Sequence, residues 1–328
     1  MSDLARLRQG NFLVIGRAGV DLYADPPGTK TEHADRFVCH LGGSSANIAV
    51  ALVKLGHAAS LVTCVSDDAV GRRALNGLDE YGVDRRFVRT VEDRDARNSI
   101  GLIETTWDDH QTVIFRNGVA DAQMNEGDVA DLPYEDFGTI VGTGTLLAGQ
   151  PSRDATFMAF EKARAAGLPV VFDIDYRPYS WPSMDEAAAT YAKAGRMADI
   201  VIGNDDEFGV MAGDYEKGRD FAASLVEEGV GIAVYKMGER GSVTFTKDGS
   251  FETPIFPVQA LKPTGAGDSF MGAFLASLAA GHGVREAVRR GSAAAALVVT
   301  RVGCAPAMPD TAELEAFMEG HDQAAAIT

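Results

Sequence analysis

The sequence has few cysteines and no long apolar run. Cys39, Cys64 and Cys304 are the only cysteines among 328 residues, they lie far apart, and no C-x-x-C pair occurs. Neither a disulfide framework nor a zinc site is therefore expected. No stretch approaches the roughly eighteen apolar residues of a membrane span, and the apolar run at residues 12–15 is too short for a signal peptide. We expect a cytoplasmic protein.

Positive charge is also scarce. The chain has 30 lysines and arginines against 47 aspartates and glutamates, which gives a formal net charge of −17. Nucleic acids and anionic membranes bind to basic surfaces, so neither is expected as a partner. A small anionic substrate would need arginines placed locally at its site.

Two common nucleotide-binding motifs are missing. The sequence has no G-x-x-x-x-G-K-[ST], so a kinase built from this chain would not be a P-loop enzyme. The glycines that follow the first apolar run have G-x-x-G spacing, which differs from the G-x-G-x-x-G of dinucleotide folds. A nicotinamide cofactor is therefore disfavoured.

The most informative stretch is KPTGAGDSFMGAFLASLAAG at residues 262–281, a glycine-rich turn that leads into a helix with apolar residues at helical spacing. Gly265, Ala266 and Gly267 should lie at the helix N-terminus, where free N–H groups and the helix dipole attract an anion. Asp268 falls in the first turn. It could simply stabilise the dipole, or it could be a general base that takes a proton from an attacking hydroxyl.

From residue 139 onward, predicted strands and helices alternate regularly. This pattern is typical of an α/β fold with a doubly wound, mostly parallel sheet and helices on both faces. Ligands bind outside the carboxyl ends of the strands in such folds. The chemically unusual residues fall there, and they are Asp21, Asp173, Asp175, Arg177, Asn204, Glu207, Lys236 and Gly238.

A small β element outside the main sheet is also predicted. SIGLIET and QTVIFR flank the turn TWDDH and indicate a hairpin, and residues 29–41 are β-like. Residues 1–328 should form a single domain, with a small β lid from about 19–41 and 97–120. The loop GRAGVDLYADPPG is expected to be neither strand nor helix. Ser44 or Ser45 should cap the next helix.

GGSSANIAV and PTGAGDSF resemble the two signatures of the ribokinase-like sugar kinases, the phosphofructokinase B family. The resemblance covers essentially residues 11–318, and it implies a ribokinase-like fold and ATP-dependent phosphorylation of a carbohydrate. It also implies that Asp268 is the catalytic base, with the anion hole formed by Gly265, Ala266 and Gly267. The implied contacts to substrate are Asp21, Gly42, Gly43 and Asn47.

Two further segments resemble the nucleotide site of this family. NDDEF resembles the N-x-x-E motif, in which Asn204 and Glu207 would organise Mg²⁺ through water. Taken alone, the same residues are typical of a capped helix start. KMGERGS resembles the segment that lines the nucleotide. The implied nucleotide contacts are Asn204, Lys236, Gly238, Gly241, Thr264 and Gly267.

DIDYRPYSW resembles the D-x-N-x-R segment of family members that act on acidic sugars, with Asp175 in place of the Asn. Arg177 precedes a proline that fixes the turn, and Arg116 ends the predicted hairpin. Together they could grip one carboxylate. Arg116 could instead be a solvated charge. A catalytically silent sensor of sugar acids on the same fold is the alternative to an enzyme.

Lys262 stands where many relatives have an aspartate that helps hold K⁺ beside the anion hole. An ammonium group cannot ligate a cation but can replace one, so dependence on a monovalent cation is doubtful. The alternative is a solvated lysine without a role. An exposed edge of the lid sheet also favours a homodimer through the lid, or a higher homo-oligomer.

Overall fold

The structure is a computed structural model that describes residues 4–107 and 109–327. Its main sheet has nine strands and is parallel except for the edge strand pair β12 and β13. In spatial order these are β13 (Gly249–Thr253), β12 (Ser242–Thr246), β11 (Ile232–Lys236), β10 (Ile200–Asn204), β9 (Val170–Asp173), β8 (Thr139–Thr143), β1 (Asn11–Ile15), β4 (Ala58–Ser66) and β5 (Asp84–Val91).

The apolar runs of the central strands are continuous because both faces of the sheet are covered. In β1, Phe12 and Val14 enter one hydrophobic core, while Leu13 and Ile15 enter the other. Successive side chains of a strand point to opposite faces, so a strand between two helical layers needs apolar residues at every position. The predicted doubly wound α/β architecture is confirmed.

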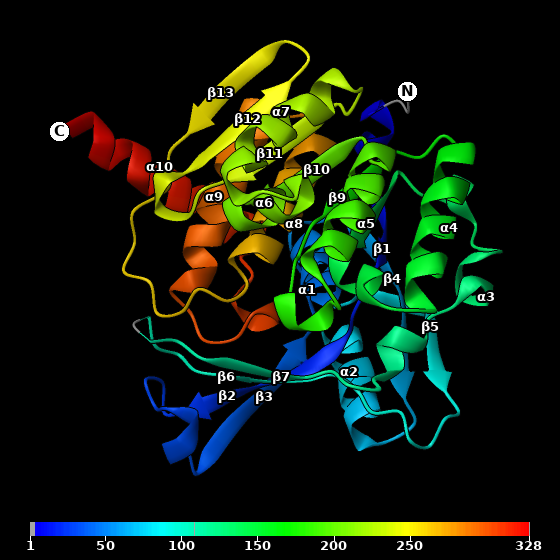
Figure 1. Cartoon of the computed structure of the whole chain (residues 1–328). Helices are drawn as coiled ribbons and strands as arrows, with labels where there is room; N and C mark the ends of the chain where they lie inside the picture. Colours follow the sequence, from blue (N-terminus) through cyan, green and yellow to red (C-terminus); the bar gives the residue numbers. More distant parts are fainter. Residues whose placement is uncertain (1–3, 108, 328) are drawn as a thin grey trace.

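Helices cover both faces of this sheet (Figure 1). The first face is covered by α3 (Glu126–Val129), α4 (Ser152–Ala165), α5 (Met184–Met197), α6 (Asp205–Ala212) and α7 (Gly218–Glu227). The second is covered by α1 (Ser44–Lys54), α2 (Ala69–Glu80), α8 (Ala266–Ala279) and α9 (Val284–Val299). The last helix, α10 (Thr311–Ile327), packs outside α9. In the described residues, no helix combines the length and apolarity needed to cross a membrane.

A second sheet of four strands lies apart from the main sheet (Figure 1). Its spatial order is β3 (Arg36–Gly42), β2 (Gly19–Asp25), β6 (Ile100–Ile103) and β7 (Thr112–Phe115). The predicted hairpin is confirmed as β6 and β7, which pair antiparallel. The prediction that residues 16–28 form neither strand nor helix was wrong, because β2 lies within them and pairs on both sides.

The two faces of the second sheet differ in chemistry. One row of register partners crosses all four strands and is apolar, namely Cys39, Leu22, Leu102 and Val113. Val113 is 44% exposed and the other three are half-buried. The neighbouring row contains Asp21 and therefore faces the other way. The sheet thus presents a partly exposed apolar face, and Asp21 lies on the opposite face.

Helices α1 and α8 approach each other closely. A Cβ atom placed on Gly272 would lie 2.4 Å from the Cβ of Ala51, which is too short for two carbon atoms that are not bonded. Only a residue without a side chain allows this approach. It brings the N-termini of α1 and α8 to the same place, beside the carboxyl ends of the main strands.

Candidate active site

The N-terminus of α8 has the features expected of an anion-binding turn. Gly265 is its N-cap residue with φ +86°, and no side chain caps the helix. A Cβ atom on Gly265 would lie 2.9 Å from the Sγ of Cys304, so glycine is required by both backbone angle and space. The ammonium of Lys236, at the end of β11, lies 3.5 Å from the Cβ position of Gly267. Free amides and a cation therefore converge on this turn.

Asp268 lies in the first turn of α8, and two side chains of α1 hold its carboxylate in place. It accepts hydrogen bonds from Ser44 Oγ at 2.8 Å and from Asn47 Nδ2 at 2.9 Å. Burial and the charge of Asp175 raise the pKa of Asp268, the two hydrogen bonds and the charge of Arg177 oppose the rise, and the resulting value is about 6. The carboxylate is therefore ionised at neutral pH but more basic than an ordinary aspartate, as a general base requires.

The predicted serine cap of α1 was wrong. The N-cap residue is Gly43, which has φ +96° and no side chain to contribute. The hydroxyl of Ser44 bonds Asp268 instead, and that of Ser45 lies 2.9 Å from Thr143 Oγ1. Because both hydroxyls bond to these other side chains, neither caps the helix.

Asp21 reaches the same region from the second sheet. A Cβ atom on Gly42 would lie 2.3 Å from the carboxyl carbon of Asp21, and one on Gly101 would lie 2.9 Å from its Oδ1. Glycine is therefore needed on both neighbouring strands to make room for this carboxyl group. Burial, with a smaller contribution from the charge of Asp268, raises the pKa of Asp21 to about 7. The two carboxyl groups thus lie close enough to influence each other.

Arg177 does not have a free guanidinium group. Its Nη2 lies 2.6 Å from Asp175 Oδ1, and its Nη1 donates to the carbonyl of Tyr176 at 2.9 Å. The neighbouring Asp175 carboxylate raises the pKa of Arg177 above its ordinary value. The Arg177 guanidinium therefore binds two groups of its own loop.

Arg116 differs from the other arginines around it. Its Nε and Nη1 are buried and have no hydrogen-bond partner among the residues that the structure describes. Its guanidinium carbon lies 6.0 Å from the centre of the Tyr179 ring. Burial lowers the pKa of Arg116, and the charge of Arg17 lowers it further. Arg17 itself is paired with Asp121 at 2.5 Å. Arg116 therefore keeps two buried N–H groups that could bind an anionic ligand.

Lys262 is fully buried behind the anion-binding turn, with an exposure of 0%. Its ammonium donates to the carbonyl of Thr264 at 2.6 Å and to that of Val298 at 3.4 Å. Burial lowers the pKa of Lys262, while the nearby carboxyl groups of Asp268 and Asp21 oppose this effect. The interpretation of Lys262 as a solvated lysine is therefore wrong.

Asn204 and Glu207 form a reciprocal capping box at the start of α6. The N–H of Glu207 donates to Asn204 Oδ1 at 2.8 Å, and the N–H of Asn204 donates to Glu207 Oε2 at 2.7 Å. The capped helix start is confirmed. The other carboxyl oxygen, Oε1, accepts from the N–H of Tyr176 at 3.3 Å. Burial raises the pKa of Glu207, and the charge of Lys236 opposes the rise.

Residues 9–311 match the family described as pfkB family carbohydrate kinase. The chain belongs to this family. Two curated relatives named 5-dehydro-2-deoxygluconokinase are similar over nearly their whole length. That from Photobacterium profundum is 37% identical over 316 residues, 95% of each chain. That from Geobacillus kaustophilus is 34% identical over 319 residues, 95% of this chain and 94% of the relative.

Solved structures agree with this assignment. An aminoimidazole riboside kinase from Salmonella enterica, complexed with aminoimidazole riboside and an ATP analogue, has a TM-score of 0.80 and 26% identity over 94% of this chain and 100% of that one. A putative ribokinase II from E. coli with ATP and Mg²⁺ has a TM-score of 0.85 at 22% identity, over 95% and 99%, and supports the fold alone. The chain is an ATP-dependent carbohydrate kinase.

The kinase brings most of the predicted site residues around the N-termini of α1 and α8. Gly241 lies differently, because a Cβ atom there would be 2.2 Å from the carbonyl oxygen of Thr253, so it packs against β13. Gly238 has no atom within 4 Å of its Cβ position and stays open to a ligand. Sequence analysis missed Ser44 as a partner of Asp268, although it lies only three residues before Asn47.

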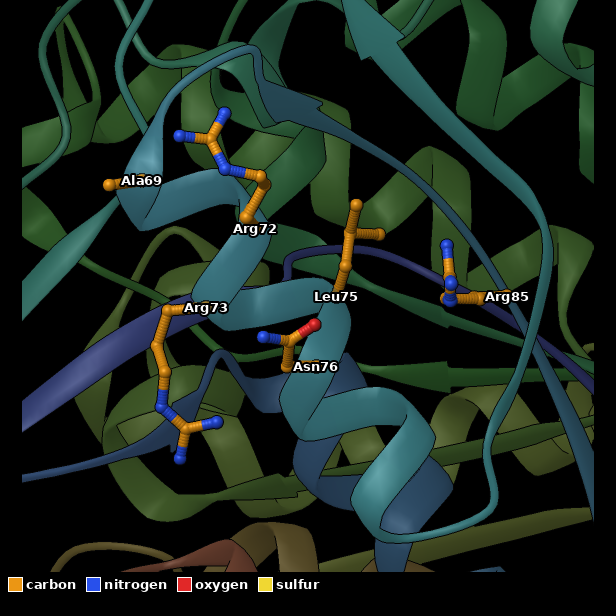
Figure 2. Close-up of a pocket in the computed structure, with 6 residues that line it drawn as sticks. All are labelled: Ala69, Arg72, Arg73, Leu75, Asn76 and Arg85. Carbon is orange, nitrogen blue, oxygen red and sulfur yellow. The ribbon is translucent and has the colours of Figure 1, made fainter.

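A separate groove of about 530 Å³ lies over α2 and β5, lined by Arg72, Arg73 and Arg85 among others (Figure 2). The side chains of Arg72 and Arg73 point in different directions there. Arg73 is paired with Glu80 at 3.4 Å and Arg85 with Asp79 at 2.6 Å. These two arginines of the groove are therefore already paired with carboxylates.

Proposed function

We propose that this kinase transfers the γ-phosphoryl group of ATP to the terminal C6 hydroxyl of 5-dehydro-2-deoxy-D-gluconate, a step of inositol catabolism. The observation that carries the proposal is Arg116, whose guanidinium has two buried N–H groups without a hydrogen-bond partner among the described residues. A substrate carboxylate would supply the missing acceptor through a charge-assisted hydrogen bond. Nearly full-length similarity to two kinases of that name supports the same substrate.

The chemistry follows from the groups around Asp268. Asp268 takes the proton of the C6 hydroxyl while that oxygen attacks the γ-phosphorus, and the bond from the γ-phosphorus to the bridging oxygen breaks to release ADP. The N–H groups of Gly265, Ala266 and Gly267 and the ammonium of Lys236 stabilise the negative charge on the transferred group. Asp21 and Asn47 orient the sugar, beside the backbone of Gly42 and Gly43.

We propose that Asn204 and Glu207 hold Mg²⁺ through water, and that Gly238 and Thr264 line the nucleotide, with Gly241 closing the turn against β13 beside them. Each carboxyl oxygen of Glu207 accepts one backbone N–H and keeps free lone pairs. The described residues contain no group of three or more His, Cys, Asp or Glu side chains that could hold a metal ion. Both facts suit an ion that keeps its water and binds phosphates, where it would neutralise their charge.

Two alternatives are tested by one experiment. The isomeric 2-dehydro-3-deoxygluconate carries the same carboxylate, and a silent sensor would bind a sugar acid without turnover. We expect ADP to form with both ATP and sugar acid present, with a higher kcat/KM for 5-dehydro-2-deoxygluconate than for the isomer. The opposite preference would make the protein a 2-dehydro-3-deoxygluconate kinase. Binding of either acid without any ADP formation would indicate the sensor.

We infer that Lys262 replaces a monovalent cation, because its ammonium already binds the carbonyl of Thr264 next to the anion-binding turn. The rate of the parent enzyme should be the same in potassium salts and in tetramethylammonium salts of equal ionic strength, which keeps screening constant. Lys262→Met should lose activity without K⁺, because it leaves buried carbonyls unpaired. Several-fold activation of the parent by K⁺, or an unchanged rate for Lys262→Met without K⁺, would contradict this role.

We further propose that the second sheet is a lid on a single cytoplasmic domain, and that its apolar face pairs with a second copy of the chain. Val113 lies 44% exposed in the apolar row of that face. Val113→Glu should convert a dimer into a monomer in light scattering, because dimerisation would bury an unpaired charge. Tyr215→Glu, at an exposed position on another surface, is the control. A parent that is monomeric at micromolar concentration would contradict the dimer.

A further inference from the structure

Tyr23 joins the second sheet to the region behind the anion-binding turn. It lies two positions after Asp21 on β2, so both side chains point to the same face of the strand. The Tyr23 side chain is fully buried, and its hydroxyl lies 3.1 Å from the Sγ of Cys304. β2 therefore brings two groups to the site, the carboxyl of Asp21 and the hydroxyl that contacts Cys304.

Cys304 contacts the anion-binding turn from behind. Its Sγ lies 2.9 Å from the position that a Cβ atom of Gly265 would take, and its own Cβ lies 3.3 Å from that position. The thiol thus packs directly against the backbone of Gly265, the N-cap residue of α8. Because Cys304 is only 3% exposed, its side chain cannot move without displacing its neighbours.

The segment that carries Cys304 is fixed independently. The ammonium of Lys54, on α1, donates to the carbonyls of Pro306 at 3.0 Å and of Met308 at 2.7 Å. On the other side, a Cβ atom on Gly303 would lie 3.2 Å from a side chain of β3. The segment between α9 and α10 is therefore held by α1 and lies against the second sheet, with the anion-binding turn packed on it.

We propose that Tyr23 and Cys304 are positioning residues of the kinase, which fix the anion-binding turn relative to Asp21 through the contact from β2 to Gly265. This inference rests on the proposed function, in which Asp21 orients the sugar and the turn stabilises the transferred phosphoryl group. The attacking hydroxyl and the γ-phosphorus are then held by two elements that touch through this pair. A misplacement of about 1 Å between reacting groups can cost roughly 100-fold in rate, so a small shift of the turn is enough to slow the reaction.

Cys304→Ala tests this inference, because it removes the thiol but leaves β2 and Asp21 unchanged. Gly265 loses the atom packed against it, and the Tyr23 hydroxyl loses its partner. We expect kcat and kcat/KM for the sugar acid to fall by the same factor, roughly 5- to 20-fold, while the KM values for ATP and for the acid stay within about twofold of the parent. This pattern is typical of a contact that acts in the transition state and not on substrate binding.

Cys304→Ser should restore most of the lost kcat, because a hydroxyl at this position can still bond Tyr23. In a Tyr23→Phe background the same serine has no partner and should restore nothing. Tyr23→Phe and Cys304→Ala should also be less harmful together than the product of their separate effects, because both remove the same contact. A double-mutant cycle on kcat, with thermal unfolding of each variant, measures this coupling.

Cys64→Ala is the matched control. Cys64 is also a fully buried cysteine with a bonded thiol, because its Sγ donates to Asp128 Oδ2 at 3.6 Å. It packs on the first face of the main sheet, whereas α8 covers the second. Cys64→Ala should lower the thermal unfolding temperature and leave kcat unchanged, which separates a loss of packing from a displaced turn.

A kcat for Cys304→Ala within twofold of the parent, or an equal loss of kcat in Cys64→Ala, would overturn the inference. Additive effects of Tyr23→Phe and Cys304→Ala would overturn it as well. If Cys304→Ala does not fold, Cys304→Ser decides, and the same kcat with and without Tyr23→Phe would then count against the pair. A failure of the proposed function would look different, because the parent itself would form no ADP with the sugar acid.

Discussion

Replacing Asp268 by asparagine is expected to lower kcat by about two to four orders of magnitude, the usual contribution of a positioned general base. Ser44 and Asn47 bond different oxygens of Asp268. An asparagine can keep both contacts if its amide oxygen accepts from Asn47 and its NH2 group donates to the Ser44 hydroxyl, which can also accept, so α1 and α8 should stay together. It cannot take up a proton at neutral pH. The KM for ATP should change little, because Asp268 would act on the sugar hydroxyl. Steady-state ADP formation at saturating substrates measures the effect.

Ser44→Ala is the matched control for Asp268→Asn. It removes one of the two hydrogen bonds but leaves the carboxylate, so the loss of kcat should be far smaller. Thermal unfolding should show that both variants remain folded. A kcat for Asp268→Asn within threefold of the parent would remove Asp268 from the role of base.

Arg116→Ala should weaken the binding of an acidic sugar far more than that of a neutral one. The loss of a charge-assisted hydrogen bond costs roughly 1.5 to 3 kcal/mol, which corresponds to a rise in KM of about 10- to 150-fold. Arg177→Ala should have a smaller effect on this KM, because its guanidinium is already bound to Asp175. The sequence suggests that the two arginines bind the substrate carboxylate together. The structure favours Arg116 as its main contact, because the Arg177 guanidinium is already paired.

An exposed arginine on the same sheet provides the control. Arg36→Ala removes a surface side chain that is paired with Asp25, and it should leave the KM for the sugar acid unchanged. Kinetics with the acid and with a neutral sugar of similar size separate charge recognition from general damage. Normal binding of the keto acid by both Arg116→Ala and Arg177→Ala would place the carboxylate elsewhere and weaken the proposed substrate class.

Much of the fold could be predicted because its signal is local. Continuous apolar runs identified β1 and β8 to β11, and turn residues separated them from helices with a clear period. The sequence did not reveal β5 or the edge pair β12 and β13. Exposed and apolar residues are mixed in β5, and β13 is mostly exposed, so neither has the pattern of a buried strand.

The site was less predictable because its key contacts join distant parts of the chain. Ser44 and Asp268 are 224 positions apart, and a serine before a helix has an ordinary local use as a cap. The pairing of Arg177 with Asp175 depends on the left-handed backbone of Asp175, which the sequence does not reveal. The burial of Lys262 also depends on α9, which supplies the carbonyl of Val298.

The close approach of α1 and α8 at Gly272 has a consequence for inherited variation in this gene. A methyl group at Gly272 would collide with Ala51 and push the two helices apart. Asp268 is carried by one helix and its hydrogen-bond donors by the other, so separation would misplace the base without altering any residue that meets a ligand. Harmful alleles should therefore accumulate along this helix seam as well as in the substrate pocket, and distance from the sugar will be a poor guide to their severity.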